Sequence, residues 1–359
     1  MSKIIRVHME PFDATRHTVT RKFDNTKLVA LNTCPTWGIV RYEKHKTYLS
    51  GGRAMPLEAG AAAHEAYAGV RLADLWFNGH HFYPDLPVRD IATARANVLF
   101  GAERTAGLIS VLESGEDSER ATMLAALEVF GTSGFYEDPN DRRRTIANIE
   151  EALIAYVSRY PLGKTMPAVI GNFVGVEIPI NMYLEIETDD GTVYRFNFTG
   201  RVDGVHFTSP KLDTLSIEEN KTASRLDEAW RLSFTTSHQP TGYMLAVSSI
   251  LKRLVTQGVV RGMAIPLPKT FDYGGIVNEP IQRDEQKFAE WAQWVLHTVQ
   301  ITDPYMDDPC NAPKYTHSCN RYFRPCSLIP FCDSPVDERE IMLEEMATEE
   351  WSPLESGNE

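Results

Sequence analysis

Two successive segments near the middle of the chain alternate apolar and polar residues at a period of two. The apolar positions are Tyr194, Phe196, Phe198 and Val202 in the first segment, and Leu212, Leu215 and Ile217 in the second. Such alternation is typical of β-strands with one buried face. The turn-rich stretch TSPKLD between the segments predicts a hairpin-like connection. We therefore expect two neighbouring strands here.

Segments with helical spacing of apolar residues surround these strands. They predict helices at 57–77, 117–131, 143–160 and 281–300, and a further helix that begins near Gln239. The helices within about 100–165 would form a helical insert before the sheet. Residues 169–186 indicate one long strand or two strands, GVVRGMAIPLP indicates another, and residues 1–30 indicate a strand or an arm. The whole pattern favours an α/β protein.

Charged residues lie at the ends of the two strands predicted near the middle of the chain. Asp203 ends the first, while Glu219 and Lys221 end the second, where side chains two apart share a face. Two carboxylates suit Mg²⁺ or Mn²⁺, with the backbone carbonyl of Asn220 as a further oxygen ligand. Such a metal lowers the pKa of a bound water, and Lys221 would orient or activate that water for phosphodiester hydrolysis. The alternative is a surface hairpin with ordinary charges.

Two helical segments add polar residues of the same kind. Gln239 and Tyr243 are four residues apart and would share a helix face, from which both can bind phosphate oxygens and the tyrosine can stack on a base. His64 lies in the Ala-rich stretch LEAGAAAHEAYAGV. Its imidazole suits Mn²⁺ better than Mg²⁺. A helix histidine without a metal role is the alternative.

Four motifs in order give the chain a family resemblance. They are G-x-x-x-H (Gly60, His64), G-R-x-D-G (200–204), E-x-K (Glu219, Lys221) and Q-x-x-x-Y (Gln239, Tyr243). Together, over roughly residues 30–335, they resemble the RecB-like branch of the PD-(D/E)XK nucleases. The resemblance implies a restriction-endonuclease-like mixed sheet flanked by helices, and metal-dependent DNA cleavage. It also implies metal ligation by His64, Asp203, Glu219 and the Asn220 carbonyl.

Asn220 departs from the family pattern, and Glu177 matches a further position of it. The middle residue of E-x-K is often tyrosine in the family and is Asn220 here, but only its carbonyl would be a ligand, so activity is not in doubt. RecB-like nucleases often carry an acid just before the first motif strand, and Glu177 matches that position. Glu177 would assist the metal site through water, or would be a glutamate on the solvent face of a strand.

The five cysteines form a second signal. Three of them lie in CNRYFRPCSLIPFC as Cys319, Cys326 and Cys332, while Cys34 and Cys310 stand apart. Four thiolates suit an iron–sulfur cluster or zinc, but the C-x2-C pairs usual for zinc are absent. The alternative is five buried free cysteines.

One early and three late cysteines are similar to the iron–sulfur nucleases of the CRISPR-associated and AddB types and their phage-encoded relatives. That similarity implies a structural [4Fe–4S] cluster joining the N- and C-terminal segments, at about 30–45 and 310–335. Its ligands would be Cys34, Cys319, Cys326 and Cys332. Cys310 is left out, although it could replace one of the late three.

Composition and charge refine the picture. The 359 residues carry a net charge of −13, of which 333–359 hold −9, leaving −4 for the remainder. A nuclease with a local basic channel can have such a balance. No apolar run is long enough for a membrane span, and no signal peptide is recognisable, so we expect a cytoplasmic protein, in the host cytoplasm if phage-encoded. We expect a nuclease domain at 1–335 and an acidic tail at 336–359, with a helix at 337–346 and a frayed end.

The sequence thus predicts a Mg²⁺- or Mn²⁺-dependent deoxyribonuclease. The resemblance implies an exonuclease acting on single-stranded DNA ends in recombination, replication or repair, as a possible homo-oligomer or with a partner protein. No P-loop is present, so no helicase motor is expected. One alternative is an accessory subunit that binds DNA ends, although the intact Asp203, Glu219 and Lys221 argue against it. Another is a CRISPR-adaptation nuclease.

Overall fold

The structure is a computed structural model that describes residues 3–48, 55–115, 117–265, 275–321 and 324–350. Contacts within the chain divide it into two units. Unit 1 comprises Met1–Gly52, Ile180–Gly200 and Glu285–Glu359, and unit 2 comprises Arg53–Pro179 and Arg201–Asp284. Strands β7 (Val176–Thr188) and β8 (Val193–Phe207) contribute residues to both units.

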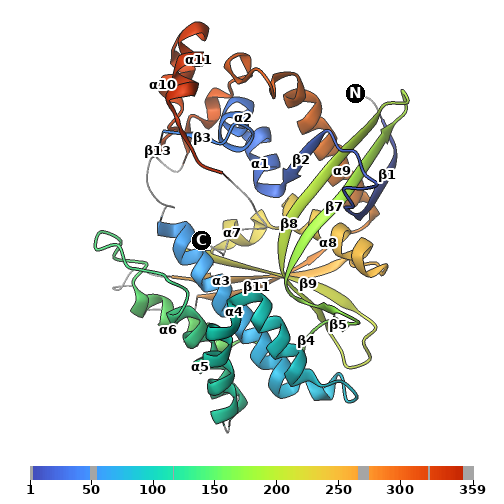
Figure 1. Cartoon of the computed structure of the whole chain (residues 1–359), viewed down its shortest axis with the longest axis vertical. Coiled ribbons are helices and arrows are strands. Elements are labelled where there is room, and N and C mark those ends of the chain that lie inside the picture. Colours follow the sequence, from blue (N-terminus) through green and yellow to red (C-terminus); the bar gives the residue numbers. More distant parts are fainter. Residues whose placement is uncertain (1–2, 49–54, 116, 266–274, 322–323, 351–359) are drawn as a thin grey trace. The chain divides into compact units, whose positions relative to one another are not determined.

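Unit 2 combines helices with the strands that carry the charged motifs (Figure 1). Its helices are α3 (Met55–Asn78), α4 (Val88–Ser114), α5 (Ser118–Gly131), α6 (Ile146–Val157), α7 (Glu228–Ser233) and α8 (His238–Leu251), with η1 (Gly79–His81). Its other strands are β4 (Met166–Pro167), β5 (Val169–Ile170), β6 (Phe173–Val174), β9 (Leu215–Ala223), β10 (Gln257–Ala264) and β11 (Ile276–Gln282). The helices predicted at 57–77, 117–131, 143–160 and near Gln239 are confirmed as α3, α5, α6 and α8. The segment 169–186, predicted as one or two strands, forms β5, β6 and β7, and the predicted strand GVVRGMAIPLP forms β10 up to Ala264, while its residues 266–268 lie outside the described residues. Strands β4 and β11, helix α7 and the part of α4 before residue 100 were not predicted.

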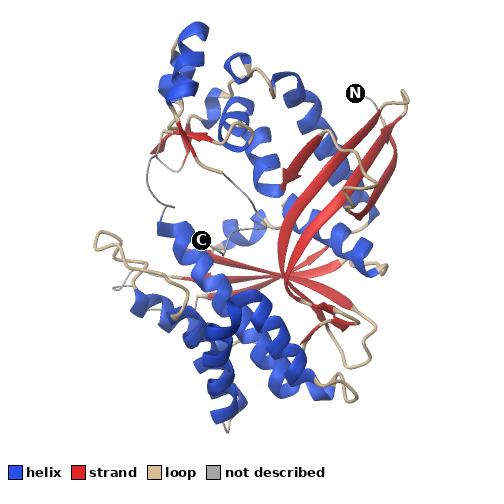
Figure 2. Ribbon diagram, in the orientation of Figure 1, coloured by secondary structure: helices blue, strands red, loops and turns tan. Residues whose placement is uncertain are grey.

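The sheet of unit 2 runs in the order β7-β8-β9-β10-β11 and is mostly antiparallel. Strands β8 and β9 pair antiparallel from Gly204↔Glu218 to Phe207↔Leu215, which confirms the predicted hairpin. Strand β10 runs parallel to β9 and antiparallel to β11. Helices flank these strands (Figure 2). The mixed α/β architecture agrees with the predicted restriction-endonuclease-like fold.

Small residues on α3 allow its close packing in unit 2. Its alanines join α6 side chains and the end of β10 in one buried cluster that includes Ala62, Ala66, Leu153 and Met263. A Cβ atom added at Gly69 would lie 3.1 Å from Val129 of α5, so glycine permits the close approach of α3 and α5. Helix α3 is thereby fixed against both its helical neighbours and the sheet.

Unit 1 contains both ends of the chain. Strand β1 (Ile4–Pro11) pairs antiparallel with β7, and β2 (Arg21–Asp24) pairs parallel with β8. Its helices are α1 (Asn25–Thr33), α2 (Pro35–Tyr42), α9 (Glu285–Thr302), α10 (Ile329–Asp333) and α11 (Val336–Glu345), with short η2 (Asp303–Tyr305), η3 (Pro309–Asn311) and η4 (Thr316–Ser318). Short strands β12 (Asn320–Arg321) and β13 (Arg324–Pro325) pair with each other. The fully buried Trp291 of α9 packs edge-on against Phe198 of β8.

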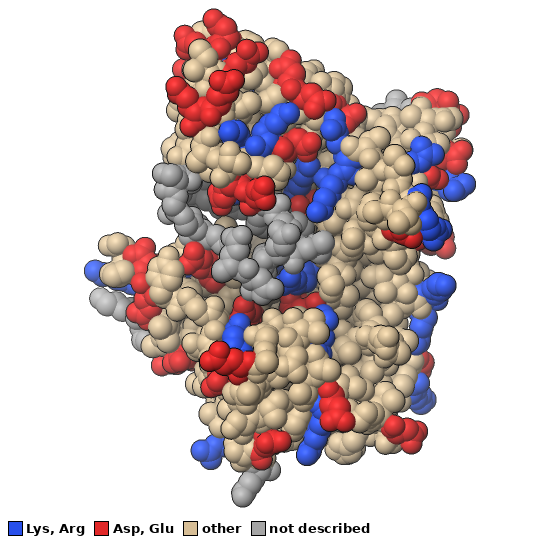
Figure 3. Space-filling model, in the orientation of Figure 1, with Lys and Arg blue, Asp and Glu red and all other residues tan. Residues whose placement is uncertain are grey.

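The acidic tail begins with the predicted helix, here α11, and acidic side chains gather around it at the top of Figure 3. Beyond the helix, β14 (Ala347–Thr348) pairs with β3 (Lys46–Thr47) in place of the expected frayed end. Arg41 binds the carbonyl and the carboxylate of Glu349. Residues 351–359 of the predicted tail lie outside the described residues. Within the described part of the chain, no helix has the length and apolar character needed to cross a bilayer.

A buried acid on α3 makes the stability of the fold depend on pH. Asp74 is fully buried, and its Oδ1 accepts hydrogen bonds from Asn78 Nδ2 (2.8 Å) and the backbone N–H of Gly163 (2.9 Å). Its Oδ2 has no hydrogen-bond partner. Burial raises the pKa of Asp74 from 3.8 to about 7, against the effect of the two hydrogen bonds.

We predict that Asp74→Asn flattens the dependence of stability on pH. The raised pKa means that protonated Asp74 contributes stability that is full below about pH 4 and is lost as the pH rises towards 7. The stability of the variant relative to wild type should therefore increase by on the order of 3 kcal/mol across that window. Urea unfolding at pH 4.5 and 8 measures this change. A constant difference at both values would contradict the prediction.

Candidate metal centre and active site

Asp203 lies on β8, one residue before the antiparallel pairing with β9 begins. It is only 5 % exposed. Its Oδ1 lies 3.3 Å from Nδ1 of His64, and its Oδ2 accepts a hydrogen bond of 2.5 Å from the backbone N–H of Asn220. The motif strand β8 is thus joined both to helix α3 and to the E-x-K segment of β9.

Glu219 and Lys221 project from the same face of β9, as their spacing predicted, because Lys221 Nζ donates to Glu219 Oε1. Glu219 is 2 % exposed, whereas the Lys221 side chain remains 30 % exposed. The second carboxylate oxygen of Glu219, Oε2, is buried and has no hydrogen-bond partner. A partly exposed ammonium group therefore lies beside a carboxylate that has a free oxygen.

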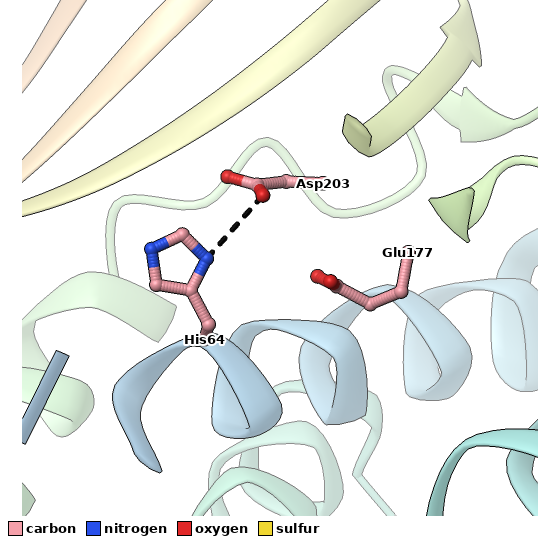
Figure 4. A group of neighbouring side chains, drawn as sticks. All are labelled: His64, Glu177 and Asp203. Carbon is pink, nitrogen blue, oxygen red and sulfur yellow. Dashed lines mark ion pairs between the residues drawn. The ribbon is translucent and has the colours of Figure 1, made fainter. Parts of the chain in front are cut away.

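His64 and Glu177 complete a compact group with Asp203. Each of the three residues offers one ligand atom, and these three atoms all lie within 4.8 Å of one another. Among the described residues, no other set of three or more His, Cys, Asp or Glu residues meets this criterion. Figure 4 shows His64 rising from α3 towards Asp203, with the Glu177 carboxylate directed into the same space. Glu177 is buried and therefore does not lie on a solvent face.

The electrostatics of this group favour a bound cation. Burial, followed by repulsion from Asp203, raises the pKa of Glu177 above its usual range, although Arg71 opposes this. Burial also raises the pKa of Glu219, with Lys221 opposing and Asp203 adding to the shift. Burial disfavours the charged form of Asp203, yet His64, Arg71 and Lys221 together outweigh burial and lower the pKa of Asp203. Crowded carboxylates of this kind are relieved by a cation.

The residues present fit a divalent metal. Carboxylate oxygens with one imidazole are a donor set suited to Mn²⁺ and related ions. Oε2 of Glu219 is buried without a hydrogen-bond partner, and so is the hydroxyl of Tyr67, whose ring centroid lies 5.7 Å from that of His64. The site thus has both ligands and unsatisfied groups for a hydrated ion.

A buried ionic network lies next to the site and contacts Glu177. Glu218 is 1 % exposed and lies between Arg71, at 2.9 Å from Nη2, and Arg261, at 2.9 Å from Nε. The two guanidinium groups hold the pKa of Glu218 well below its usual range despite burial. Arg71 also contacts Glu177, with Nη1 3.3 Å from Oε1. The motifs did not indicate any of the three residues of this triad.

Asn220 is tied into the same network. Its side-chain Oδ1 accepts a hydrogen bond of 2.8 Å from the Tyr156 hydroxyl, and its Nδ2 lies 3.4 Å from Glu218 Oε1. Together with the hydrogen bond from its N–H to Asp203, these contacts hold in place the residue whose carbonyl is the proposed ligand. A tyrosine side chain from α6 thus contacts the residue where the family often has tyrosine.

Gln239 and Tyr243 share a face of α8, as predicted, and Gln239 Nε2 lies 3.4 Å from the Tyr243 hydroxyl. Tyr243 is buried, with 5 % of its surface exposed. Arg283 fixes the start of α8 by donating to Thr241 Oγ1 (2.9 Å) and to the carbonyl of Phe234 (2.7 Å).

The cysteines gather in unit 1. Cys34, Cys319, Cys326 and Cys332 all line one pocket of about 200 Å³, whose wall also includes apolar residues such as Trp37 and Leu328. All five cysteines are free, and no three of their sulfur atoms lie within 4.8 Å of one another. Cys310 is absent from the pocket wall and packs in the apolar cluster around Phe331.

The family follows from this geometry together with a comparison. Residues 110–333 match the model of the PD-(D/E)XK nuclease superfamily. The chain belongs to this superfamily. Membership implies a nuclease that uses divalent metal ions and has DNA as its substrate. Among curated proteins, none matches the chain. The matched residues include Asp203, Glu219 and Lys221. His64 lies outside the matched range, but the fold places it next to Asp203.

We predict that Glu218→Gln destabilises the protein strongly. The change leaves two buried arginines without their carboxylate, and breaking such a buried pair costs about 3–5 kcal/mol. Urea unfolding at neutral pH measures the loss. Glu279→Gln is the control, because Glu279 pairs with the half-exposed Arg231 at 2.8 Å and should cost less than about 1 kcal/mol. Equal losses in both variants would contradict a special role of the triad.

Proposed function

We propose that this protein is a Mg²⁺- or Mn²⁺-dependent DNA exonuclease that hydrolyses phosphodiester bonds at single-stranded ends, in recombination, replication or repair. The observation that carries the proposal is the convergence of His64, Glu177 and Asp203 beside the Glu219–Lys221 pair. Superfamily membership supports the nuclease chemistry. The four ordered motifs support the RecB-like branch and its preference for ends.

In this proposal the metal is held by His64, Asp203, Glu219 and the carbonyl of Asn220, with Glu177 assisting. A divalent ion bound there would polarise the phosphoryl group and lower the pKa of a coordinated water. Lys221 is the group that orients this water, because its ammonium group is anchored on Glu219 while staying partly exposed. The same positive charge offsets charge that develops on the phosphate oxygens.

Gln239 and Tyr243 position the scissile strand in this proposal. Their amide and hydroxyl groups share one helix face and contact each other, which leaves further hydrogen-bonding capacity for phosphate oxygens. Arg283 holds the first turn of their helix from within the protein. A strand contact through these residues would therefore rest on a fixed backbone.

We further propose a structural [4Fe–4S] cluster on Cys34, Cys319, Cys326 and Cys332. All four side chains line one pocket with apolar walls. Zn–S bonds of about 2.3 Å would require four sulfurs about 3.8 Å apart, which is tighter than the arrangement present. Burial, followed by the neighbouring Cys34, raises the pKa of Cys332 to about 11, so its thiol stays protonated at neutral pH until a metal displaces the proton.

We predict that Asp203→Asn and Lys221→Ala abolish DNA cleavage. Each change removes a charge from the proposed metal and water site, and a loss of at least about 10²-fold is expected. The assay uses end-labelled linear single strands and matched closed circles with Mg²⁺ or Mn²⁺. Linear strands should be degraded and circles spared.

Asp213→Asn is the matched control, because Asp213 lies in the exposed β8–β9 connection, where it accepts a hydrogen bond of 3.1 Å from Ser209. It should cleave like wild type. Equal DNA processing by wild type and both site variants would refute the nuclease proposal and favour the alternative of a DNA-end-binding accessory subunit. Rapid cutting of circles would refute the exonuclease assignment alone.

We predict that Cys319→Ser loses the cluster whereas Cys310→Ser keeps it. Cys319 lines the pocket and Cys310 does not. Anaerobically purified wild type and Cys310→Ser should show a broad absorption shoulder near about 400 nm and about four irons per chain, while Cys319→Ser should be nearly colourless. Iron and sulfide analysis checks the stoichiometry. A zinc-containing or metal-free wild type would rule out the cluster, and loss of iron from Cys310→Ser would reassign a ligand.

A further inference from the structure

Glu177 has an unusual backbone for a residue in a strand. Its φ is +48°, in the left-handed region that residues with side chains rarely adopt. Side chains normally alternate between the faces of a strand. Here Val176, Glu177 and Ile178 are buried in succession, so neither face of the strand meets solvent at this position. The left-handed backbone at Glu177 interrupts the regular strand geometry that produces the alternation. The strained peptide therefore determines where the carboxylate points.

Arg95 of α4 binds the two carbonyls that flank this strained position. Its Nε and Nη2 donate to the carbonyl of Val176 at 2.9 and 2.6 Å, and Nη2 also donates to the carbonyl of Glu177 at 2.7 Å. A planar guanidinium can make these contacts together because its donors form a rigid fork. The two carbonyls are thereby held in one orientation.

Arg71 of α3 acts on the other end of the same residue. Its Nη1 lies 3.3 Å from Glu177 Oε1, while its Nη2 lies 2.9 Å from the buried Glu218. The backbone and the carboxylate of Glu177 are therefore bound by arginines from two different helices. Strained backbones persist where the surrounding structure fixes them, and they concentrate at functional sites.

We propose that Arg95 is a positioning residue that holds the left-handed Glu177 peptide and so directs the Glu177 carboxylate into the metal centre with His64 and Asp203. The inference rests on the proposed metal site. Without the guanidinium fork, the Glu177 backbone relaxes towards ordinary strand geometry, which turns the carboxylate away from the site. Arg95 itself contacts the carbonyls and acts only through Glu177.

The test measures Mn²⁺ binding in the absence of DNA, by isothermal titration calorimetry on the full chain. Arg95→Ala should weaken Mn²⁺ binding by about 10- to 100-fold, the range typical of residues that orient metal ligands. Arg95→Lys should recover only part of the affinity, because an ammonium group lacks the planar fork. Arg89→Ala is the control, because Arg89 lies on the same helix but over the ring of Trp76. It should bind Mn²⁺ like wild type.

A double-mutant cycle with Glu177→Gln separates positioning from general stability. If Arg95 acts through the Glu177 carboxylate, Arg95→Ala should change Mn²⁺ affinity by less than about twofold in the Glu177→Gln background. The same loss in both backgrounds would overturn the proposal. Circular dichroism and thermal unfolding check the folding of each variant, and Arg95→Lys serves in the cycle if Arg95→Ala does not fold.

The outcomes also distinguish this proposal from the one on which it rests. Wild type that binds no Mn²⁺ would overturn the metal site itself, and the role of Arg95 with it. Wild type that binds Mn²⁺, with Arg95→Ala binding equally well, would overturn the role of Arg95 alone. If Arg95→Ala weakens Mn²⁺ binding in the wild-type background but not in the Glu177→Gln background, the result would support both the metal site and the role of Arg95.

Discussion

A single buried carboxylate, Glu218, links the scaffold of unit 2 to its candidate site. Its charge is desolvated, and the guanidinium groups of Arg71 on α3 and Arg261 on β10 provide the main compensation for that cost. The ion triad therefore requires helix and sheet to keep one relative position. Because Arg71 also contacts Glu177, the same cation that satisfies the scaffold restrains a side chain of the metal centre. Small displacements of α3 would therefore disturb both.

The triad also explains why polar residues can occupy both faces of β9. Residues from Ile217 to Asn220 are all buried, so neither face of this part of the strand meets bulk solvent. Glu218 faces the arginines, while Glu219 contacts Lys221. Burial raises the pKa of Glu219, which has an oxygen without a partner, whereas the arginines lower that of Glu218. Neighbouring glutamates thus have opposite roles, one structural and one open to a ligand.

The sequence indicated the candidate metal ligands but not the ion triad of Glu218, Arg71 and Arg261. Period-two alternation and the motif order predicted β8, β9 and the convergence of His64 with Asp203, because these signals are local or shared by the family. The partners of Glu218 could not be predicted, since Arg71 is 147 residues away. One signal was present in the motif glycine, Gly204. A Cβ there would lie 3.0 Å from Arg71 Nε, so the glycine marks where the guanidinium crosses the strand.

The two candidate metal sites differ in chemistry as well as in place. Unit 2 offers carboxylates and an imidazole, which suit hard divalent ions, whereas unit 1 offers four thiols, which suit iron–sulfur clusters and softer metals. Sequence spacing alone left the choice among five cysteines open. The pocket narrows this choice, because Cys34, Cys319, Cys326 and Cys332 line it and Cys310 does not, although Cys326 and Cys332 also pack against the apolar cluster that contains Cys310. Because their donor atoms differ, the two sets would favour different metals.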